Sequence, residues 1–220
     1  MCGIFTLLNN KDTLDNDFIM EQFNAGQHRG PDNSSINVSN NIFVGFHRLQ
    51  INGLNNDSNQ PFIINNIMLI CNGEIYNYKN LYKNIKYKPT TNSDCEVIIY
   101  LYMLYGIEYT LNLLDGVFAF ILFDYNINRI FACRDVFGVR PLFYLHNPDT
   151  IIYESIHELS FKNLIGFASE MKQLIEINNK VNDYASEEVI NFNNILYIKP
   201  CIPGEYMEFE LSENSKWYLS

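Results

Sequence analysis

Cysteine is the second residue of the chain, directly after Met1, and it could carry nucleophilic chemistry. Methionine is normally removed when the next side chain is small, which would leave Cys2 with a thiol and a free α-amine. The thiol is a good nucleophile once deprotonated, and an α-amine, with a pKa of roughly 7.7–8.0, can take up its proton. One terminal residue would then supply nucleophile and general base, as in N-terminal threonine hydrolases. Alternatively, Cys2 is a small, inert residue that opens a buried strand.

Three further polar segments at the ends of apolar runs could complete a site for covalent acyl transfer. They are residues 47–52, 71–77 and 91–96. Attack by a thiolate on a carbonyl produces an oxyanion that needs two donors, for which the Asn72 amide and the Gly73 backbone N–H are candidates. A substrate carboxylate suits a bidentate guanidinium, here that of Arg48. A substrate ammonium suits carboxylates, and Asp94 and Glu74 are the candidates.

Each of these residues also has an ordinary structural explanation. Asn-Gly is a common turn dipeptide, so Asn72 and Gly73 are explained equally well by a turn. Asp94 stands in the first turn of a predicted helix, where it interacts favourably with the helix dipole. Arg48 is also explained as a surface charge at the end of a strand. Taken singly, the candidates leave both explanations open.

The apolar pattern predicts the elements that would position these residues. A helix that starts at Asp94 is indicated by a capping box of Ser93 and Glu96, and Gly106 is its expected stop. The other predicted helices are 14–25, 77–87 and 170–177, and the predicted strands are 2–8, 42–47, 67–71, 117–123, 129–133, 142–145, 165–168 and 205–209. Most strands are hairpin-linked and they outnumber the helices, which favours an α+β fold of antiparallel sheets and packed helices.

Composition excludes several classes of protein. The chain has 220 residues, 47% hydrophobic and 18% charged, and a net charge of −10, which argues against a nucleic acid or an anionic membrane as partner. Its five cysteines are unpaired in spacing, so neither a disulfide framework nor a metal site is expected. No targeting segment or membrane span is evident, and a reducing, cytoplasmic location is expected.

The order and spacing of Cys2, Arg48, Asn72, Gly73 and Asp94 resemble those of a known family. It is the glutaminase domain of glutamine-hydrolysing asparagine synthetase, a class II glutamine amidotransferase domain. The resemblance covers nearly the whole chain through the motifs HRGPD at 28–32, NQP at 59–61, LDGVFA at 114–119, RDVFGVRPL at 134–142, FASEMK at 167–172 and PGEY at 203–206. The wording NGEIYN at 72–77 and SDCE at 93–96 resembles the asparagine synthetase branch more than other branches of the class.

The resemblance implies a fold and a role for each matching residue. The fold is the N-terminal nucleophile hydrolase fold, a four-layer α/β/β/α sandwich of two antiparallel sheets. Cys2 would be the nucleophile, with its α-amine as base through a water. Asn72 and Gly73 would form the oxyanion hole. The glutamine pocket would comprise these two residues and Arg48, Leu49, Gln50, Ile51, Asn52, Glu74 and Asp94.

The resemblance also implies partners and leaves alternatives. We expect residues 1–220 to form one amidotransferase domain, without the ATP-binding synthetase domain that would hold ATP and Mg and receive the ammonia. This chain would then need no cofactor and would convert glutamine and water to glutamate and ammonia. A homodimer is a further possibility, and residues 144–163 are expected to be a surface excursion. The alternatives are a glutaminase for another amide-forming ligase and a non-catalytic partner-binding or sensor module.

Overall fold

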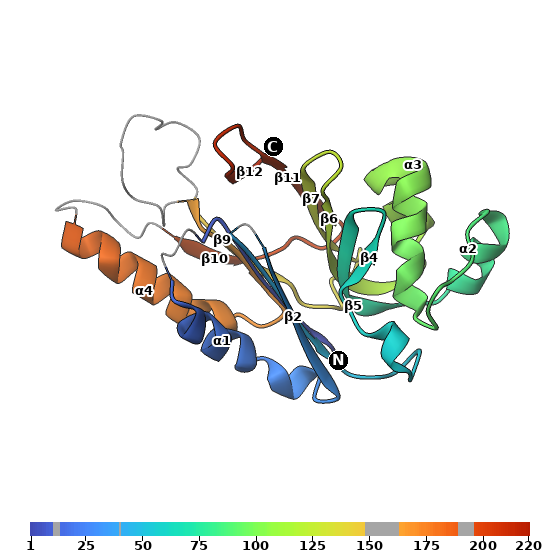
Figure 1. Ribbon diagram of the computed structural model, residues 1–220, viewed down its shortest axis with the longest axis horizontal. Helices are drawn as coiled ribbons and strands as arrows, with labels where there is room; N and C mark the ends of the chain where they lie inside the picture. The colour runs from blue at the N-terminus through green and yellow to red at the C-terminus, as the bar shows by residue number, and fades with distance from the viewer. Residues whose placement is uncertain (11–13, 40, 148–162, 189–195) are drawn as a thin grey trace.

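Two antiparallel sheets pack face to face between two layers of helices (Figure 1). The structure is a computed structural model that describes residues 1–10, 14–39, 41–147, 163–188 and 196–220. Figure 1 shows α1 and α4 along the outer face of one sheet and α2 and α3 on the side of the other. This arrangement confirms the predicted four-layer α+β sandwich.

The first sheet has six strands in the order β10-β8-β9-β1-β3-β2. Their bounds are β1 Gly3–Leu8, β2 Asn33–Ser39, β3 Ile42–Arg48, β8 Phe143–His146, β9 Ile165–Ala168 and β10 Tyr197–Pro200. The central strand β1 is buried along its whole length, and it pairs with β3 in a register that sets Gly3 opposite His47. This pairing places the residue before β1, Cys2, beside the end of β3.

The second sheet has six strands in the order β12-β11-β7-β6-β5-β4. Their bounds are β4 Phe62–Ile64, β5 Ile67–Ile75, β6 Gly116–Asp124, β7 Arg129–Arg134, β11 Tyr206–Leu211 and β12 Trp217–Leu219. The β5–β6 pair is the longest in the molecule's described part, running from Ile67 opposite Asp124 to Ile75 opposite Gly116. Because β5 is this long, Asn72 and Gly73 lie near its C-terminal end, where burial begins to decrease.

Three apolar clusters show why the layers stay together. The central cluster joins inward residues of both sheets, such as Phe46 and Phe167 from the first and Ile121 from the second. Because side chains alternate along a strand, the outward residues of each sheet are left for the helices. Phe5 and Leu7 therefore pack with α1 and α4, while Leu69 and Phe120 pack with α2 and α3.

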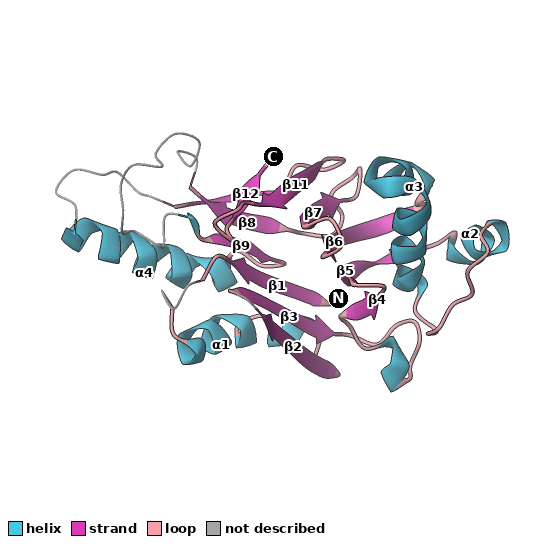
Figure 2. Cartoon of the chain, turned by 45° about the horizontal axis from the view of Figure 1, so that its top comes forward, coloured by secondary structure: helices cyan, strands magenta, loops and turns pink. Residues whose placement is uncertain are grey.

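The helices cover these outer faces and have recognisable boundaries. They are α1 Asn16–Asn24, α2 Tyr78–Asn84, α3 Val97–Leu113 and α4 Lys172–Glu188 (Figure 2). Asp15 caps α1 by accepting a hydrogen bond from Phe18 N at 2.8 Å. The expected stop at Gly106 is a break inside α3, where φ reaches +77° before a second helical run begins. No helix in the described part of the chain is long and apolar enough to cross a membrane.

The capping box predicted for Ser93 and Glu96 is wrong. Ser93 does act as a cap, since its hydroxyl accepts from Cys95 N at 3.3 Å, but the first turn, Asp94–Glu96, is a 3-10 turn ahead of α3. The Glu96 carboxylate turns instead to the preceding loop and accepts from the backbone N–H groups of Thr90 and Thr91 at 3.0 and 2.9 Å. Glu96 is fully buried, so it fixes this loop, and with it the start of α3.

Short edge strands were missed by the pattern of apolar residues. They are β2, β4, β10 and β12, each at the edge of a sheet. Three of them have only three or four residues, and the apolar residues of β2, Ile36 and Val38, are exposed. The predicted excursion at 144–163 is wrong at its start, because Tyr144 to His146 belong to β8. Most of the remainder, 148–162, lies outside the described residues.

Candidate active site

Cys2 lies where the ends of the two sheets meet. It packs against the central cluster between them, and β1 contacts β5 directly. A cavity beside it is lined by residues from both sheets and their loops, namely Met1, Cys2, Arg48, Leu49, Ile51, Asn52, Ser58, Gln60, Cys71, Asn72, Gly73, Glu74, Ser93, Asp94, Cys95 and Arg140. Every residue predicted for the site lines this cavity except Gln50, whose backbone N–H donates to Asp32 Oδ2 at 2.7 Å.

The cavity beside Cys2 is narrow. Its free volume of about 30 Å³ holds little more than one water, so a ligand of amino-acid size must displace lining groups. Met1 is one of these groups, and its removal would widen the cavity. A larger hollow of about 310 Å³ lies beside Tyr102, Gly106 and Asp124, but none of the predicted site residues lines it. The smaller cavity is therefore the one lined by the predicted catalytic and substrate-binding residues.

The Cys2 thiol lies against the backbone of Leu49. Leu49 N donates to Sγ at 3.4 Å, and Leu49 O accepts from the thiol at 3.6 Å. Burial raises the pKa of the Cys2 thiol, an effect that the Leu49 N–H, the N-terminal amine and Arg48 only partly offset. The thiol is thus protonated near neutral pH and needs a base before it can attack.

The N-terminal amine is electrostatically suited to be that base. Burial lowers the pKa of the amine on Met1; Cys2 opposes this effect, while the nearby guanidinium groups of Arg29 and Arg140 add to it. An amine with a lowered pKa is neutral in a larger fraction of the protein molecules near pH 7 and can then accept a proton. Removal of Met1 would take this amine away, and the backbone nitrogen of Cys2 would become the new N-terminal amine.

Arg48 is a buried cation that has no carboxylate partner among the described residues. Only 4% of its surface is exposed, so the explanation as a surface charge is wrong. Its Nη1 donates to Asn55 O at 3.1 Å and to the Asn59 side chain, and its Nη2 donates to the carbonyls of Asn52 and Gly53. Burial lowers the pKa of the guanidinium, the expected result for a desolvated charge. Such a cation is a receptor for an anion.

Asn72 and Gly73 lie inside β5, so the explanation of this pair as a turn is wrong. Asn72 pairs with Ala119 and Gly73 with Phe118. The Asn72 Nδ2 atom is buried and has no hydrogen-bond partner, although only 1% of the residue is exposed. A buried donor left unpaired costs about 1–3 kcal/mol, which an oxygen entering the cavity would recover.

A side chain at position 73 would not fit. A Cβ built there would lie 2.7 Å from Phe118 Cβ and 2.8 Å from Val117 O. Glycine therefore lets β5 and β6 approach closely at the point where β5 borders the cavity. The same residue leaves the backbone at position 73 without a Cβ, as the predicted oxyanion hole requires.

Two carboxylates, Asp94 and Glu74, form the acidic side of the cavity. Asp94 Oδ2 accepts from Ile75 N at 2.6 Å, and its carboxylate also bonds the Asn52 side chain. Burial raises the pKa of Asp94, and the neighbouring charge of Glu74 raises it further, against these hydrogen bonds. Glu74 forms an ion pair with Arg140 at 2.9 Å. A ligand cation between the two carboxylates would offset the burial and the charge repulsion that disfavour ionised Asp94.

Gln60 is a positioning residue to which the sequence patterns assigned no role. Its Nε2 donates to Cys71 O at 3.0 Å, and its Oε1 accepts from Cys71 N at 2.5 Å. The side-chain amide thus replaces the strand partner that β4, which ends its pairing at Leu69, no longer supplies. Gln60 holds β5 in place one residue before Asn72. The NQP motif at residues 59–61, which contains Gln60, was the feature of the sequence that pointed to this residue.

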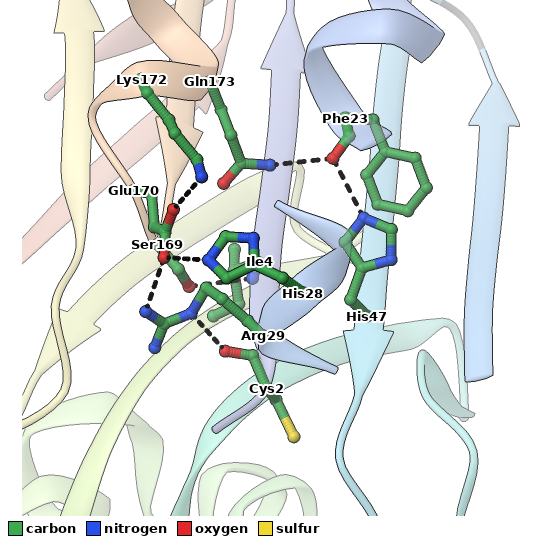
Figure 3. A network of polar contacts seen from close by, with 10 residues as sticks. All are labelled: Cys2, Ile4, Phe23, His28, Arg29, His47, Ser169, Glu170, Lys172 and Gln173. Carbon is green, nitrogen blue, oxygen red and sulfur yellow. Dashed lines mark hydrogen bonds and ion pairs between the residues drawn. The ribbon is translucent and has the colours of Figure 1, made fainter. Parts of the chain in front are cut away.

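Arg29 supports Cys2 from the side opposite the cavity. Its Nε donates to Cys2 O at 2.9 Å, and its Nη1 forms an ion pair with Glu170 at 3.2 Å. Figure 3 shows Glu170 also facing His28 and Lys172, at 2.9 and 3.0 Å, while the Cys2 sulfur points away from this group. The motifs HRGPD and FASEMK, far apart in sequence, are therefore one support for the nucleophile.

The same network extends along the first sheet. Ile4 N donates to the Ser169 hydroxyl at 2.9 Å, and Ser169 N returns a bond to Ile4 O at 2.9 Å. His47 Nε2 and Gln173 Nε2 both lie within hydrogen-bond distance of Phe23 O, at 3.0 and 3.1 Å (Figure 3). These contacts join α1 to β3 and to the start of α4, and they join Ser169 to β1, the strand that follows Cys2.

Comparison with solved structures identifies the fold. The glutamine phosphoribosylpyrophosphate amidotransferase of B. subtilis aligns with all of this chain and 49% of its own, with a TM-score of 0.67 and 16% identity. A structure described as the allosteric regulatory enzyme of purine biosynthesis aligns equally well, over 48% of its chain. With a cysteine that opens the central strand, the chain has the N-terminal nucleophile hydrolase fold of glutamine amidotransferases.

Comparison of sequences identifies the family. Residues 1–216 match the glutamine amidotransferase domain, and the chain belongs to this family. The probable glutamine-hydrolysing asparagine synthetase of Acanthamoeba polyphaga mimivirus is 37% identical over 83% of this chain and 32% of its own length. The asparagine synthetase of Gallus gallus is 33% identical over 98% of this chain and 35% of its own. The chain thus spans about a third of the length of these relatives.

Proposed function

We propose that this chain hydrolyses glutamine to glutamate and ammonia through a thioester on Cys2. The observation that carries the proposal is the state of the buried polar groups around the thiol. Arg48 is a cation without a carboxylate among the described residues, and Asn72 Nδ2 is a donor without an acceptor. Together with the acidic side at Asp94, they are complementary to an amino acid that carries a reacting carbonyl.

The proposed binding mode follows from these charges. The α-carboxylate of glutamine binds Arg48, and its ammonium binds Asp94 and Glu74, where it competes with Arg140 for the Glu74 carboxylate. The side-chain amide then extends toward Cys2. Its carbonyl oxygen meets Asn72 Nδ2 and the Gly73 N–H, which stabilise the negative charge that develops during attack. Leu49, Ile51 and Asn52 form the wall of the pocket beside the thiol.

The reaction has two stages, formation of the thioester and its hydrolysis. In the first, the α-amine of Cys2 removes the thiol proton through a water, an Sγ–C bond forms, and the C–N bond of the amide breaks. The leaving nitrogen takes the proton and departs as ammonia. In the second, the amine activates a water that attacks the thioester, which releases glutamate and restores the thiol. Side chains, backbone groups and water supply every step.

The proposal extends to the partner that uses the ammonia. The relatives are asparagine synthetases, so we propose an ATP-dependent synthetase domain or subunit as acceptor, with aspartate as the amidated substrate. Residues 1–220 would act as one amidotransferase domain in that system. The chain's own reaction would need neither ATP nor a metal. A cytoplasmic location, a homodimer and the lack of a nucleic-acid partner stay predictions.

The test combines activity with the chemical state of the N-terminus. Mass spectrometry of the purified protein would show whether the chain starts at Cys2. Glutamate and ammonium would be measured with glutamine as the only substrate, and we expect equal amounts of both from protein that lacks Met1. Protein in which an added N-terminal residue prevents the removal of Met1 should be inactive. The nitrogen of Cys2 is then part of a peptide bond and cannot act as the base.

Cys201→Ala is a matched control for the nucleophile. Cys201 is also buried, at 4% exposure, but its side chain packs in the central cluster away from the cavity lining. Burial raises the pKa of its thiol to about 12, so it is unreactive at neutral pH. The reference is the glutamine hydrolysis of trimmed wild-type protein. The same activity in Cys2→Ala, or its loss in Cys201→Ala, would contradict the assignment.

A further inference from the structure

One edge of β5 has no neighbouring strand beyond Leu69, where its pairing with β4 ends. Successive residues of an antiparallel strand direct their backbone groups to opposite neighbours, so every second residue faces this open edge. Cys71 is one of them, since its N–H and carbonyl bond the Gln60 side chain. Ile75 is another, because its N–H donates to Asp94 Oδ2 at 2.6 Å. Side chains therefore take the place of a strand along this edge.

Gly73 lies midway between Cys71 and Ile75, so its N–H and carbonyl face the same open edge. The Cys95 thiol donates to the carbonyl, with 3.6 Å between the sulfur and the oxygen. The Gly73 N–H has no strand partner on this side, and no side chain in the described part of the chain accepts from it. It can therefore donate into the cavity that Gly73 lines, which the unpartnered Asn72 side chain also lines.

The backbone at Gly73 needs a restraint if its N–H is to stabilise an oxyanion. Glycine has no Cβ and therefore has more backbone freedom than any other residue. An oxyanion donor is effective only when it is held about 2.7–3.1 Å from the place where the charge develops. Gln60 and Asp94 fix the strand two residues before and two residues after Gly73. The Cys95 thiol is the described side chain that bonds Gly73 itself.

Cys95 is well placed to hold the Gly73 carbonyl. It belongs to the 3-10 turn Asp94–Glu96, which packs on β5, and its N–H is held by the Ser93 hydroxyl at 3.3 Å. Only 3% of the residue is exposed, so water does not compete for the thiol. A hydrogen bond with the Cys71 thiol, together with burial, raises the pKa of the Cys95 thiol well above its ordinary value. The thiol is therefore protonated near neutral pH and remains a donor.

We propose that Cys95 is a positioning residue for the oxyanion hole, and this rests on the glutaminase function proposed above. Its thiol holds the Gly73 carbonyl, and so fixes the Gly73 N–H toward the reacting carbonyl oxygen of glutamine. Cys95 acts through the backbone of Gly73 and not on the substrate. Because the charge on that oxygen develops only during attack, loss of the thiol should lower kcat and leave KM for glutamine nearly unchanged.

The experiment compares four variants of trimmed protein by the kcat and KM of glutamate formation. Cys95→Ala removes the donor, and Cys95→Val removes it while it fills a similar volume. We expect both to lower kcat about three- to tenfold and to leave KM within about twofold of wild type. Cys95→Ser keeps a donor and should retain kcat within about twofold. Cys133→Ala is the matched control and should also retain kcat, since Cys133 is fully buried in the same apolar cluster but does not line the cavity.

Several outcomes would overturn the positioning role. They are an unchanged kcat in Cys95→Ala or Cys95→Val, a loss that appears in KM instead of kcat, and an equal loss in Cys133→Ala. A Cys95→Ser variant as slow as Cys95→Ala would also overturn it, because the loss would then not follow the hydrogen-bond donor. If Cys95→Ala does not fold, Cys95→Val still tests the donor, since it keeps the volume in the cluster.

These outcomes separate the positioning role of Cys95 from the glutaminase proposal. If trimmed wild-type protein hydrolyses no glutamine, the function proposed above fails, and the role of Cys95 fails with it. If wild-type protein hydrolyses glutamine and the variants without a donor at position 95 keep its kcat, the positioning role alone fails.

Discussion

The two sides of Cys2 differ in how their charges are compensated. On the side of Arg29, the charged groups neutralise one another, since Glu170 pairs with Arg29, His28 and Lys172 within 3.2 Å. On the cavity side, buried Arg48 has no carboxylate partner among the described residues, and Asn72 Nδ2 has no acceptor. Charge is therefore balanced on the first side, although Arg29 Nη2 and Gln173 Oε1 are also buried without a hydrogen-bond partner among the described residues. On the second side, the charge of Arg48 would be balanced only by a ligand.

The difference separates support from function. A buried charge without a counter-charge destabilises a folded protein, so the position of Arg48 beside the nucleophile favours the cavity side as the surface that binds substrate. Paired groups behind the nucleophile hold its backbone without engaging the substrate. Substitutions on the cavity side should therefore change kinetic constants, and substitutions on the Arg29 side should change stability. The following predictions test this division, in order of decreasing effect.

Removal of the nucleophile should have the largest effect. Cys2→Ala is expected to lower glutamine hydrolysis by roughly 10³-fold or more, because no other group forms the thioester. A glutamine analogue with an electrophilic diazoketone, 6-diazo-5-oxo-norleucine, should alkylate Cys2 alone. Its reactive carbon would take the place of the glutamine amide beside the Cys2 thiol and its base, whereas Cys71, Cys95, Cys133 and Cys201 pack in apolar clusters. Peptide mass mapping after labelling provides the measurement, and a modified cysteine elsewhere would contradict it.

Asn72→Ala should lower kcat by roughly 10²–10³-fold and change KM little. The oxyanion appears only during attack, so a donor directed at it acts on the transition state and not on the bound substrate. Steady-state kinetics of glutamate formation separates the two constants. A raised KM with an unchanged kcat would make Asn72 a substrate-binding residue, and the oxyanion hole would then have to be sought elsewhere.

Arg48→Lys should raise KM for glutamine by about tenfold or more while kcat falls less. The ammonium keeps the charge but loses the planar fork that donates to the loop at residues 52–59 and that we propose to bind the α-carboxylate. Because the α-carboxylate is held equally in ground state and transition state, the loss is mainly in binding. A kcat that fell while KM stayed constant would assign Arg48 to the chemical step.

Asp94→Asn should raise KM for glutamine several-fold, since the amide cannot pair with the substrate ammonium. The same change should stabilise the unliganded protein at pH 8. Burial raises the pKa of Asp94 in the folded state, so its ionised form costs folding free energy, and this cost vanishes as the pH falls through the raised pKa. Urea unfolding of both proteins from pH 8 to pH 4 should show a gap that closes in acid.

The pH dependence of wild-type binding offers a second measurement at the same residue. KM should rise as Asp94 becomes protonated, and KM of Asp94→Asn should lack this dependence. Equal pH profiles for the two proteins would show that Asp94 does not hold the ammonium, even if the variant binds glutamine weakly for another reason.

Glu170→Gln should have the smallest kinetic effect and a measurable effect on stability. Burial pushes the pKa of Glu170 upward, but bonds from Lys172, Arg29 and His28 outweigh it, so the pKa lies below its ordinary value. Its stabilising contribution, about 1 kcal/mol for partly exposed pairs, is present at neutral pH and is lost as the pH falls through the folded-state pKa. Unfolding experiments at pH 7 and pH 3 should show the difference disappearing, with KM unchanged at pH 7.

Much of the fold follows from local sequence. The strands at 42–48, 116–124, 129–134 and 165–168 and the helices α1 and α3 were predictable because long apolar patterns identify buried elements. The edge strands were not, because β4, β10 and β12 have only three or four residues and the alternating apolar residues of β2, Ile36 and Val38, are exposed. Glu96 was misassigned as a cap since local spacing does not reveal that its carboxylate bonds a loop instead.

The sequence by itself determined which residues could do the chemistry: a cysteine at position 2, a guanidinium at 48 and an amide beside a glycine at 72–73. Only the tertiary structure decided which of them meet, and in what state. Arg48 has no counter-charge among the described residues, and Gln60 acts as a strand partner for Cys71. Arg29 joins Cys2 to Glu170, which lies 141 residues after Arg29 in the sequence. Desolvation and pairing depend on groups distant in sequence, so no local pattern contains them.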